Sequence, residues 1–163
     1  MKSKEIIPYI VIIIVVFLIR TYIATPVIVS GDSMLPTLKE NQLLLLNKAS
    51  YYINDIKRYD IVVIKRENDE IIKRVIGLPG EVIEYRDNVL YVNGHEVDSE
   101  YDFDTDDFNL KKVCNCTEIP SGKYLVLGDN RKYSADSRIL GLFDESSIEG
   151  KVNLSLWPIK KVK

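Results

Sequence analysis

Residues 60–76 read DIVVIKRENDEIIKRVI, two short apolar runs separated by a charged segment. Each run, 60–65 and 71–76, has the length of a β-strand and is rich in valine and isoleucine, which favour strands. Runs of the same kind recur at residues 43–47, 82–85, 89–92, 123–127 and 152–157. After residue 25 no helix-period stretch of a dozen residues stands out. The sequence therefore predicts a mostly β body, an antiparallel or barrel-like sheet with one short helical turn near residues 144–147.

A two-residue turn is predicted at Asn93-Gly94, between the run 89–92 and Glu96. Asn-Gly is the strongest short hairpin signal, because both residues tolerate the positive φ of a type I′ turn. His95, the only histidine of the chain, follows this turn directly. We therefore expect it at an exposed position, where it is a poor candidate for a catalytic base.

The first 25 residues differ from this body. Residues 6–19 read IIPYIVIIIVVFLI and carry no charge. A bilayer core needs roughly 20 apolar residues, and the stretch reaches Ile23 if the Arg20 side chain extends to the membrane surface. Lys2 and Lys4 precede it, which favours a cytoplasmic N-terminus and an exported body.

The alternative for this segment is a cleavable secretory signal peptide, which has the same charge and apolar pattern. A cut after Ala24 would place Tyr22 at the third residue upstream, where a small side chain is required. A cut after Gly31 is chemically tolerable but lies far from the apolar segment. We therefore expect an uncleaved anchor over residues 1–25 and an extracytoplasmic domain over residues 26–163. This makes the chain a single-pass protein of the cell membrane with its N-terminus in the cytoplasm.

The composition excludes several classes of protein. The chain has 163 residues with 22 basic and 24 acidic side chains, for a formal net charge of -2. This balance gives no reason to expect nucleic-acid binding. Apolar residues make up 46% and charged residues 28%, which excludes a disordered chain.

An acid-rich insertion is predicted at about residues 96–118. Its first part holds seven acids: Glu96, Asp98, Glu100, Asp102, Asp104, Asp106 and Asp107. A calcium loop starting at Asp102 would need glycine at its sixth position and glutamate at its twelfth, where the sequence has Asp107 and Val113. A solvated segment is expected instead. The sequence leaves open whether Cys114 and Cys116 are joined, and two sulfurs alone do not make a zinc site.

A serine nucleophile without a histidine can use a neutral lysine as its base. At an ordinary pKa of about 10.4, only about 0.04% of a lysine is neutral at pH 7, so the amine must be buried. Lys73 lies within the apolar run 71–76, unlike Lys39 or Lys112, which lie among polar residues. Strand alternation points Lys73 and Arg74 to opposite faces. The alternative is a lysine on an exposed face.

Two further stretches could complete such a site. Ser33 follows a Gly31-Asp32 turn that could raise it above the surface, and the apolar residues Met34 and Leu35 come next. Residues 127–138, LGDNRKYSADSR, place small hydroxyls and carboxylates beside two arginines after a strand. Each stretch taken alone is also compatible with ordinary turn chemistry.

Together these stretches resemble the type I signal peptidases, bacterial membrane-anchored serine proteases with a Ser/Lys dyad. The resemblance rests on four motifs behind an N-terminal apolar segment: SGDSMLPTL (30–38), YDIVV (59–63), IKRVIGLPG (72–80) and GDNRKYSADSR (128–138). The single span and short body are similar to the compact form of the family in Gram-positive bacteria. The resemblance implies a catalytic β domain of the signal peptidase type.

The resemblance also implies roles for individual residues. It makes Ser33 the nucleophile and Lys73 the general base, and Ser134 matches the hydroxyl that orients the lysine amine. Asp136 and Arg138 match an ion pair that supports the site, and Asp129 is grouped with these supporting residues. Met34 matches the residue after the nucleophile. Some members carry an oxyanion-hole hydroxyl two residues before the nucleophile, where this chain has Gly31. The implied reaction removes signal peptides from exported preproteins after small residues, of the Ala-x-Ala type. The implied partners are signal peptides and membrane lipid, with no cofactor, metal or nucleic acid, and with a monomeric enzyme.

Two other functions are compatible with parts of the sequence. A self-cleaving repressor of the SOS type shares the nucleophile turn and a distant lysine, but needs no membrane span and lacks the late 128–138 block. A membrane-tethered β module that binds signal-like segments without cutting them is expected to lack either the nucleophile or the lysine, and both are present here.

Overall fold

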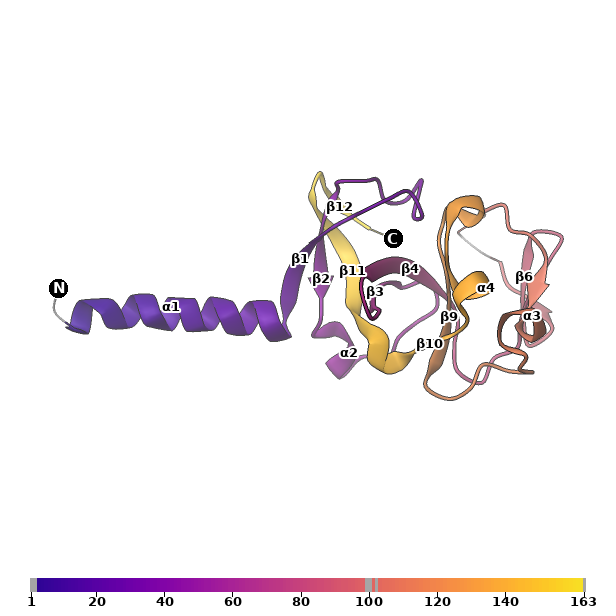
Figure 1. The fold of residues 1–163 in the computed structure, drawn as a ribbon, viewed down its shortest axis with the longest axis horizontal. Coiled ribbons are helices and arrows are strands. Elements are labelled where there is room, and N and C mark those ends of the chain that lie inside the picture. Colours follow the sequence, from indigo (N-terminus) through magenta and orange to yellow (C-terminus); the bar gives the residue numbers. More distant parts are fainter. Residues whose placement is uncertain (1–2, 99–100, 102, 163) are drawn as a thin grey trace.

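The computed structural model describes residues 3–98, 101 and 103–162 of the chain. The longest helix, α1 (Ser3–Tyr22), projects away from a β-rich body (Figure 1). The other helices are short: α2 (Ser50–Ile53), α3 (Leu110–Cys114) and α4 (Ser137–Leu140), with 3-10 turns η1 (Arg131–Tyr133) and η2 (Glu145–Ser147). The strands are β1 (Ala24–Ile28), β2 (Leu43–Asn47), β3 (Ile61–Lys65), β4 (Glu70–Gly77), β5 (Ile83–Arg86), β6 (Val89–Val92), β7 (His95–Glu96), β8 (Phe108–Asn109), β9 (Lys123–Leu127), β10 (Phe143–Asp144), β11 (Ile148–Trp157) and β12 (Ile159–Lys161).

The strands of the described residues form two antiparallel sheets. The larger has the order β1-β2-β11-β3-β4-β9-β10, with β12 paired to β11, and the smaller has the order β7-β6-β5-β8. The larger sheet lies between α1 and the smaller sheet, and α3 lies at the end of the molecule opposite α1 (Figure 1), where it contacts β8 and α4. The prediction of a mostly β, antiparallel fold is confirmed.

The core of the larger sheet fixes the start of the predicted nucleophile turn. Leu44 and Leu46 alternate with half-buried neighbours along β2, as expected for a strand with one covered face. They pack with Val63 of β3 and with Met34 and Leu38, which follow β1. Strand β3 is buried on both faces because Ile61 and Val63 pack in one hydrophobic cluster and Val62 and Ile64 pack in another. The turn that carries Ser33 therefore rests on the rigid centre of the domain.

Most predicted strands are found within one or two residues of their expected bounds. The Asn93-Gly94 hairpin is confirmed by the pairing of β6 with β7, and His95 is exposed. Strand β11 begins four residues earlier than predicted because Gly150 lets it pass close to β2, since a Cβ there would meet the Asn47 carbonyl oxygen at 2.5 Å. Helices α2, α3 and α4, of four or five residues, were not predicted because they are too short to show helical periodicity.

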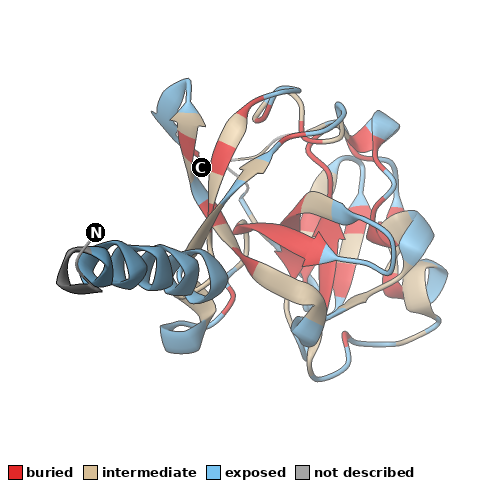
Figure 2. Ribbon diagram, turned by 60° about the vertical axis from the view of Figure 1, so that its left-hand side comes forward, coloured by how far each residue is buried: buried red, intermediate tan, exposed pale blue. Residues whose placement is uncertain are grey.

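Helix α1 confirms that the N-terminal apolar segment is helical. Its described apolar side chains are exposed, among them Ile13 at 67% and Phe17 at 65% (Figure 2). Across the part of the chain that the structure describes, no helix has both the length and the apolar content required to cross a membrane. The membrane span itself stays a prediction.

The described part of the acid-rich insertion contains buried residues as well as exposed acids. Glu100 and Asp102 lie outside the described residues, and the other five acids are exposed. Between them Thr105 is only 3% exposed, and Phe108 belongs to the core of the smaller sheet. Cys114 and Cys116 are joined by a disulfide at the end of α3. The pairing that the sequence left open is therefore present.

Candidate active site

Ser33 lies in a turn between β1 and β2. The turn begins at Gly31, whose φ of +79° favours glycine, and the amide of Leu35 donates to the Asp32 carbonyl at 3.1 Å. Asn130 holds the turn from a distant part of the chain. Its amide donates to the Ser33 carbonyl at 3.0 Å, and its side-chain amide donates to the Asp32 carbonyl at 3.1 Å. The sequence reasoning did not assign Asn130 to the site.

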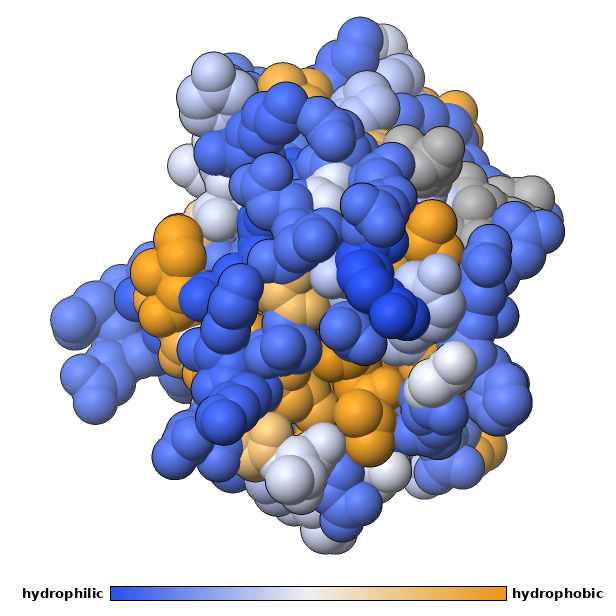
Figure 3. Space-filling view, turned by 90° about the vertical axis from the view of Figure 1, so that its right-hand side faces the viewer, coloured by the Kyte–Doolittle hydropathy of each residue, from blue (hydrophilic) through white to orange (hydrophobic). Residues whose placement is uncertain are grey.

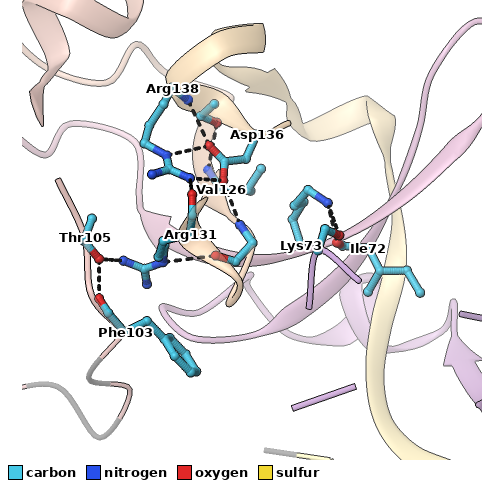
Figure 4. A network of polar contacts seen from close by, with 11 residues as sticks. Ile72, Lys73, Phe103, Thr105, Val126, Arg131, Asp136 and Arg138 are labelled. Atoms are coloured by element: carbon cyan, nitrogen blue, oxygen red, sulfur yellow. Dashed lines mark hydrogen bonds and ion pairs between the residues drawn. The ribbon is translucent and has the colours of Figure 1, made fainter. Parts of the chain in front are cut away.

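The Lys73 amine lies against the Ser33 hydroxyl. Lys73 comes from β4, only 3% of the residue is exposed, and its Nζ lies 2.8 Å from Ser33 Oγ. The amine also donates to the Ile72 carbonyl at 3.0 Å (Figure 4). Burial lowers the pKa of Lys73, and the nearby carboxylates of Asp136 and Asp129 partly oppose that shift. Lys73 is therefore placed and tuned to be neutral more often than an exposed lysine.

Arg74, the next residue of β4, is fully buried and pairs with Asp129. Its Nε and Nη2 donate to the two carboxylate oxygens at 2.8 and 2.6 Å, and its Nη1 donates to the Tyr59 carbonyl at 3.0 Å. Both side chains of this ion pair are 0% exposed. The sequence reasoning singled out Asp129 but not Arg74 as its partner. The sequence did contain a signal for this pair. Lys73 and Arg74 are successive cations in an apolar strand and point to opposite faces, so at least one of them had to be buried, and a buried arginine needs a carboxylate partner.

Asp136 and Arg138 form the second predicted pair. Arg138 Nε and Nη2 donate to the two Asp136 oxygens, each at 2.9 Å (Figure 4). Asp136 also accepts from the Gly128 amide at 3.0 Å, and it is the N-cap of α4. Arg138 Nη2 donates in turn to the Arg131 carbonyl. These bonds tie α4 to the end of β9, next to Asp129.

Ser134 lies close to the same loop but makes no hydrogen bond within the described residues. The residue is 6% exposed, and its Oγ is buried without a partner. A Cβ added at Gly128 would lie 2.2 Å from Ser134 Oγ and 2.5 Å from the Ser33 carbonyl oxygen. Gly128 thus allows the loop to approach the nucleophile turn. The predicted orienting contact from Ser134 to Lys73 is not made in this structure.

A cavity of about 100 Å³ opens beside Ser33 and Lys73. One wall is formed by residues 27–30, along and just after β1, and the other by residues 70–73 of β4. Within the described residues β1 pairs only with β2, and the first half of β4 pairs only with β3, since its bonds to β9 begin at Arg74. The cavity therefore lies between two strand edges that pair with no further strand in the described structure.

Comparison with known proteins identifies this arrangement. The family described as "Signal peptidase, peptidase S26" matches residues 3–157. The chain is thus a serine peptidase of the S26 class, which confirms the predicted enzyme. Signal peptidase IB of Staphylococcus aureus (strain COL) is 39% identical over 180 residues, covering 99% of this chain and 94% of that protein. Signal peptidase I of Bacillus caldolyticus is 41% identical over 165 residues, covering 94% of this chain and 91% of that protein.

A solved structure agrees with these relatives. The crystal structure of a signal peptidase I from Enterococcus faecalis V583 matches with a TM-score of 0.56 and 37% identity, covering 60% of this chain and 97% of that chain. The chain belongs to the signal peptidase I family. Its general activity is that of this family, the removal of signal peptides by a serine peptidase.

Proposed function

We propose that the chain is a membrane-anchored endopeptidase in which Ser33 is the nucleophile and Lys73 the general base. The observation that carries the proposal is the 2.8 Å contact between Lys73 Nζ and Ser33 Oγ at a lysine that is 3% exposed. A buried amine with no carboxylate in direct contact is favoured in its neutral form, and only the neutral form can accept the serine proton.

The reaction has two halves. In the first, Ser33 Oγ forms a bond to the scissile carbonyl carbon while Lys73 takes the hydroxyl proton. The bond from that carbon to the amide nitrogen then breaks, and Lys73 gives the proton to the leaving amine. In the second half Lys73 takes a proton from water, the resulting hydroxide attacks the acyl carbon, and Ser33 Oγ leaves with the proton returned. Lys73 acts as base and acid in turn.

The developing oxyanion needs hydrogen-bond donors. The Ser33 amide is the first candidate, as in other nucleophile turns. Gly31 has no hydroxyl to offer, and its φ of +79° strains any other residue at this position. We therefore infer that the second donor is a backbone amide of the turn or a water molecule. Asn130 and Met34 support the turn, since Asn130 bonds to it and Met34 is 1% exposed beneath it.

The substrate is proposed to bind as an extended strand in the cavity between β1 and β4. Free strand edges recognise extended peptides through backbone hydrogen bonds, with pockets taking alternate side chains. A cavity of about 100 Å³ lined by Val29, Ile71 and Val63 suits small apolar side chains. This supports cleavage after small residues of the Ala-x-Ala type.

The N-terminal helix is proposed to hold the enzyme at the membrane. Residues 6–19 carry no charge, their side chains are exposed on α1, and signal peptidase I enzymes are membrane-associated. By contrast, polar side chains cover much of the end of the molecule opposite α1, around an apolar patch in the lower centre of that face (Figure 3). In this arrangement residues 1–25 are the anchor, residues 26–163 act outside the cytoplasm, and the enzyme meets signal peptides at one membrane surface.

The test uses the full-length chain in detergent with a fluorogenic peptide containing Ala-x-Ala. Wild-type protein is expected to cleave after the second alanine, and Ser33→Ala and Lys73→Ala are expected to abolish cleavage while leaving the circular dichroism spectrum unchanged. Lys39→Ala, at an exposed lysine whose side chain lies outside the cavity, is the matched control for removing a lysine. Full activity of either Ser33→Ala or Lys73→Ala would reject the dyad.

A further inference from the structure

The acid-rich insertion approaches the active site with side chains that are not acidic. Its described acids point to solvent, whereas Tyr101 and Phe103 are half-buried and Thr105 is 3% exposed. We refer to Tyr101, Phe103 and Thr105 as the cover residues. They contact two buried arginines, Arg74 and Arg131, that belong to the supporting structure of the site.

Tyr101 covers the guanidinium of Arg74. The Arg74 Cζ lies 3.8 Å from the centroid of the Tyr101 ring, within the range of a cation–π contact. Tyr101 is held in turn between two rings, with centroid distances of 5.1 Å to Tyr59 and 6.4 Å to Phe103. These two ring contacts hold Tyr101 over the Arg74–Asp129 pair, whose side chains are 0% exposed.

Thr105 contacts Arg131 on the far side of the same loop. The Thr105 hydroxyl accepts a hydrogen bond from Arg131 Nη1, and Arg131 Nε donates to the Gly128 carbonyl at 3.0 Å (Figure 4). The Phe103 ring lies 5.5 Å from the same guanidinium. Thr105 is itself held by its backbone amide, which donates to the Asn88 side chain at 2.7 Å. The insertion thus supplies a hydroxyl acceptor to a cation that is 5% exposed.

Both contacts lead to the loop that holds the nucleophile. Arg74 binds Asp129, and Arg131 binds Gly128, while Asn130 between them donates to Ser33 and Asp32. We propose that Tyr101 and Thr105 are positioning residues of the peptidase reaction: they hold Arg74 and Arg131, and through them the loop 128–131 that orients Ser33 against Lys73. The inference rests on the proposed roles of Ser33 and Lys73.

The charges around Lys73 explain why this cover affects the reaction. Burial lowers the pKa of Lys73; the carboxylates of Asp136, Asp129 and Asp69 raise it and Arg66 lowers it. If Tyr101 is removed, water reaches the Arg74–Asp129 pair on the side of β4 opposite the amine, and the loop that holds Ser33 against Lys73 loses support. A displaced loop lets water reach the Lys73 amine as well, and a more hydrated amine favours the ammonium form, so the pKa of Lys73 rises and its active neutral form is lost at a higher pH.

The first test compares Tyr101→Ala with Tyr101→Phe in the full-length chain in detergent, using the fluorogenic Ala-x-Ala peptide. Tyr101→Ala is expected to lower kcat about tenfold near pH 7, because small displacements at the nucleophile are costly. KM should change little, and the acid limb of the kcat profile should move to higher pH. Tyr101→Phe keeps the ring and should behave as wild type.

Tyr91→Ala is the matched control for removing a ring from an arginine. Arg86 Cζ lies 4.2 Å from the Tyr91 ring centroid in the smaller sheet, among residues with no bond to the loop 128–131. This variant should lower the Tm without moving the pH profile. If Tyr101→Ala changes only the Tm, or if Tyr101→Phe shares its kinetic defect, the positioning role of the ring is rejected.

The second test addresses the hydroxyl. Thr105→Val keeps the shape but leaves Arg131 Nη1 without its acceptor, and should lower kcat, whereas Thr105→Ser should restore it. Equal kcat in Thr105→Val and wild type would remove Thr105 from the proposal. Ser33→Ala is measured alongside to distinguish failure of the proposed dyad from failure of the positioning role. Activity in Ser33→Ala would overturn the proposed function. An inactive Ser33→Ala together with wild-type kcat in Tyr101→Ala and Thr105→Val would overturn the positioning role alone.

Discussion

Lys73 and Arg74 are neighbours on β4 and both are buried, but the two sides of the strand surround them differently. Lys73 contacts the Ser33 hydroxyl and the Ile72 carbonyl, with no carboxylate bonded to it in the described structure. Arg74 is bonded to both oxygens of Asp129. A buried lysine without a paired carboxylate is pushed toward its neutral form, whereas an arginine stays charged in proteins and requires its partner. One strand thus supplies a base on one side and a fixed cation on the other.

The largest expected effect is on activity, when Lys73 is replaced by an arginine like its neighbour. Lys73→Arg keeps a cation at the site, but a guanidinium cannot accept the serine proton. Removing a general base costs on the order of 10²–10⁴ in rate, so kcat/KM for the fluorogenic peptide should fall by that factor. Lys65→Arg, at the exposed end of β3 in the same sheet, is the control and should keep wild-type activity. Activity of Lys73→Arg within tenfold of wild type would contradict the comparison.

The next effect is on stability: removing the charge is expected to lower the free energy of unfolding at Arg74 but not at Lys73. Arg74→Met leaves the Asp129 carboxylate buried without its cation, and breaking a buried pair in this way costs about 3–5 kcal/mol. Lys73→Met removes a buried amine that has no carboxylate bonded to it, so the free energy of unfolding should stay the same or rise. Urea denaturation of the two variants measures the difference.

The double variant Arg74→Met/Asp129→Leu serves as the control for this prediction. Replacing a whole buried pair by apolar residues is often neutral, so the double variant should be more stable than Arg74→Met. If Arg74→Met and Lys73→Met are equally stable, the two sides of β4 do not differ in the way proposed.

A third prediction uses pH to observe the Lys73 side directly. The pKa of Lys73 is lowered in the folded chain, so between that pKa and the ordinary value of 10.5 the unfolded chain binds more protons than the folded chain. Stability therefore rises with pH across this window. Below the window, the cost of a buried ammonium is present in full, and above 10.5 it is absent. The unfolding free energy of wild type minus that of Lys73→Met should rise as pH increases toward 10.5, and a flat difference would show that the amine is not perturbed.

Much of this comparison could be predicted from the sequence. The apolar run that holds Lys73 and Arg74 predicted both a strand and a lysine that could lose its proton, since these conclusions need only alternation and local composition. The strand pattern and the Asn93-Gly94 hairpin were predicted for the same reason. The motifs also selected Ser33, and the structure brings it to Lys73 across 40 residues of sequence.

The remaining features depend on long-range contacts, which local patterns do not encode. The pairing of Arg74 with Asp129 joins residues 55 apart, and the bond from Asn130 to Asp32 joins residues 98 apart. The acid-rich insertion was expected in solvent because its acids dominate the local pattern. Its aromatic residues pack on Arg74 and Arg131, which are close to each other because β4 pairs with β9. This pairing is not visible in the local sequence of the insertion. Helices of four or five residues were missed because their length is close to one turn.

The smallest effect is expected at Ser134, whose hydroxyl lies by Gly128 and the Ser33 carbonyl without a hydrogen bond. Ser134→Ala removes no bond and relieves a buried unpaired oxygen, so the free energy of unfolding should change by less than about 1 kcal/mol. If this hydroxyl orients the Lys73 amine once Ser33 has been acylated, kcat should nevertheless fall, by about tenfold at most because one neutral hydrogen bond is involved. Ser147→Ala, which loses an exposed hydrogen bond to the Asp144 carbonyl, is the control and should leave kcat unchanged. If Ser134→Ala has a wild-type kcat, Ser134 does not orient Lys73, and the amine is positioned by Ser33, Ile72 and β4 alone. Burial would then be sufficient to explain why Lys73 acts as a base while Arg74 stays charged.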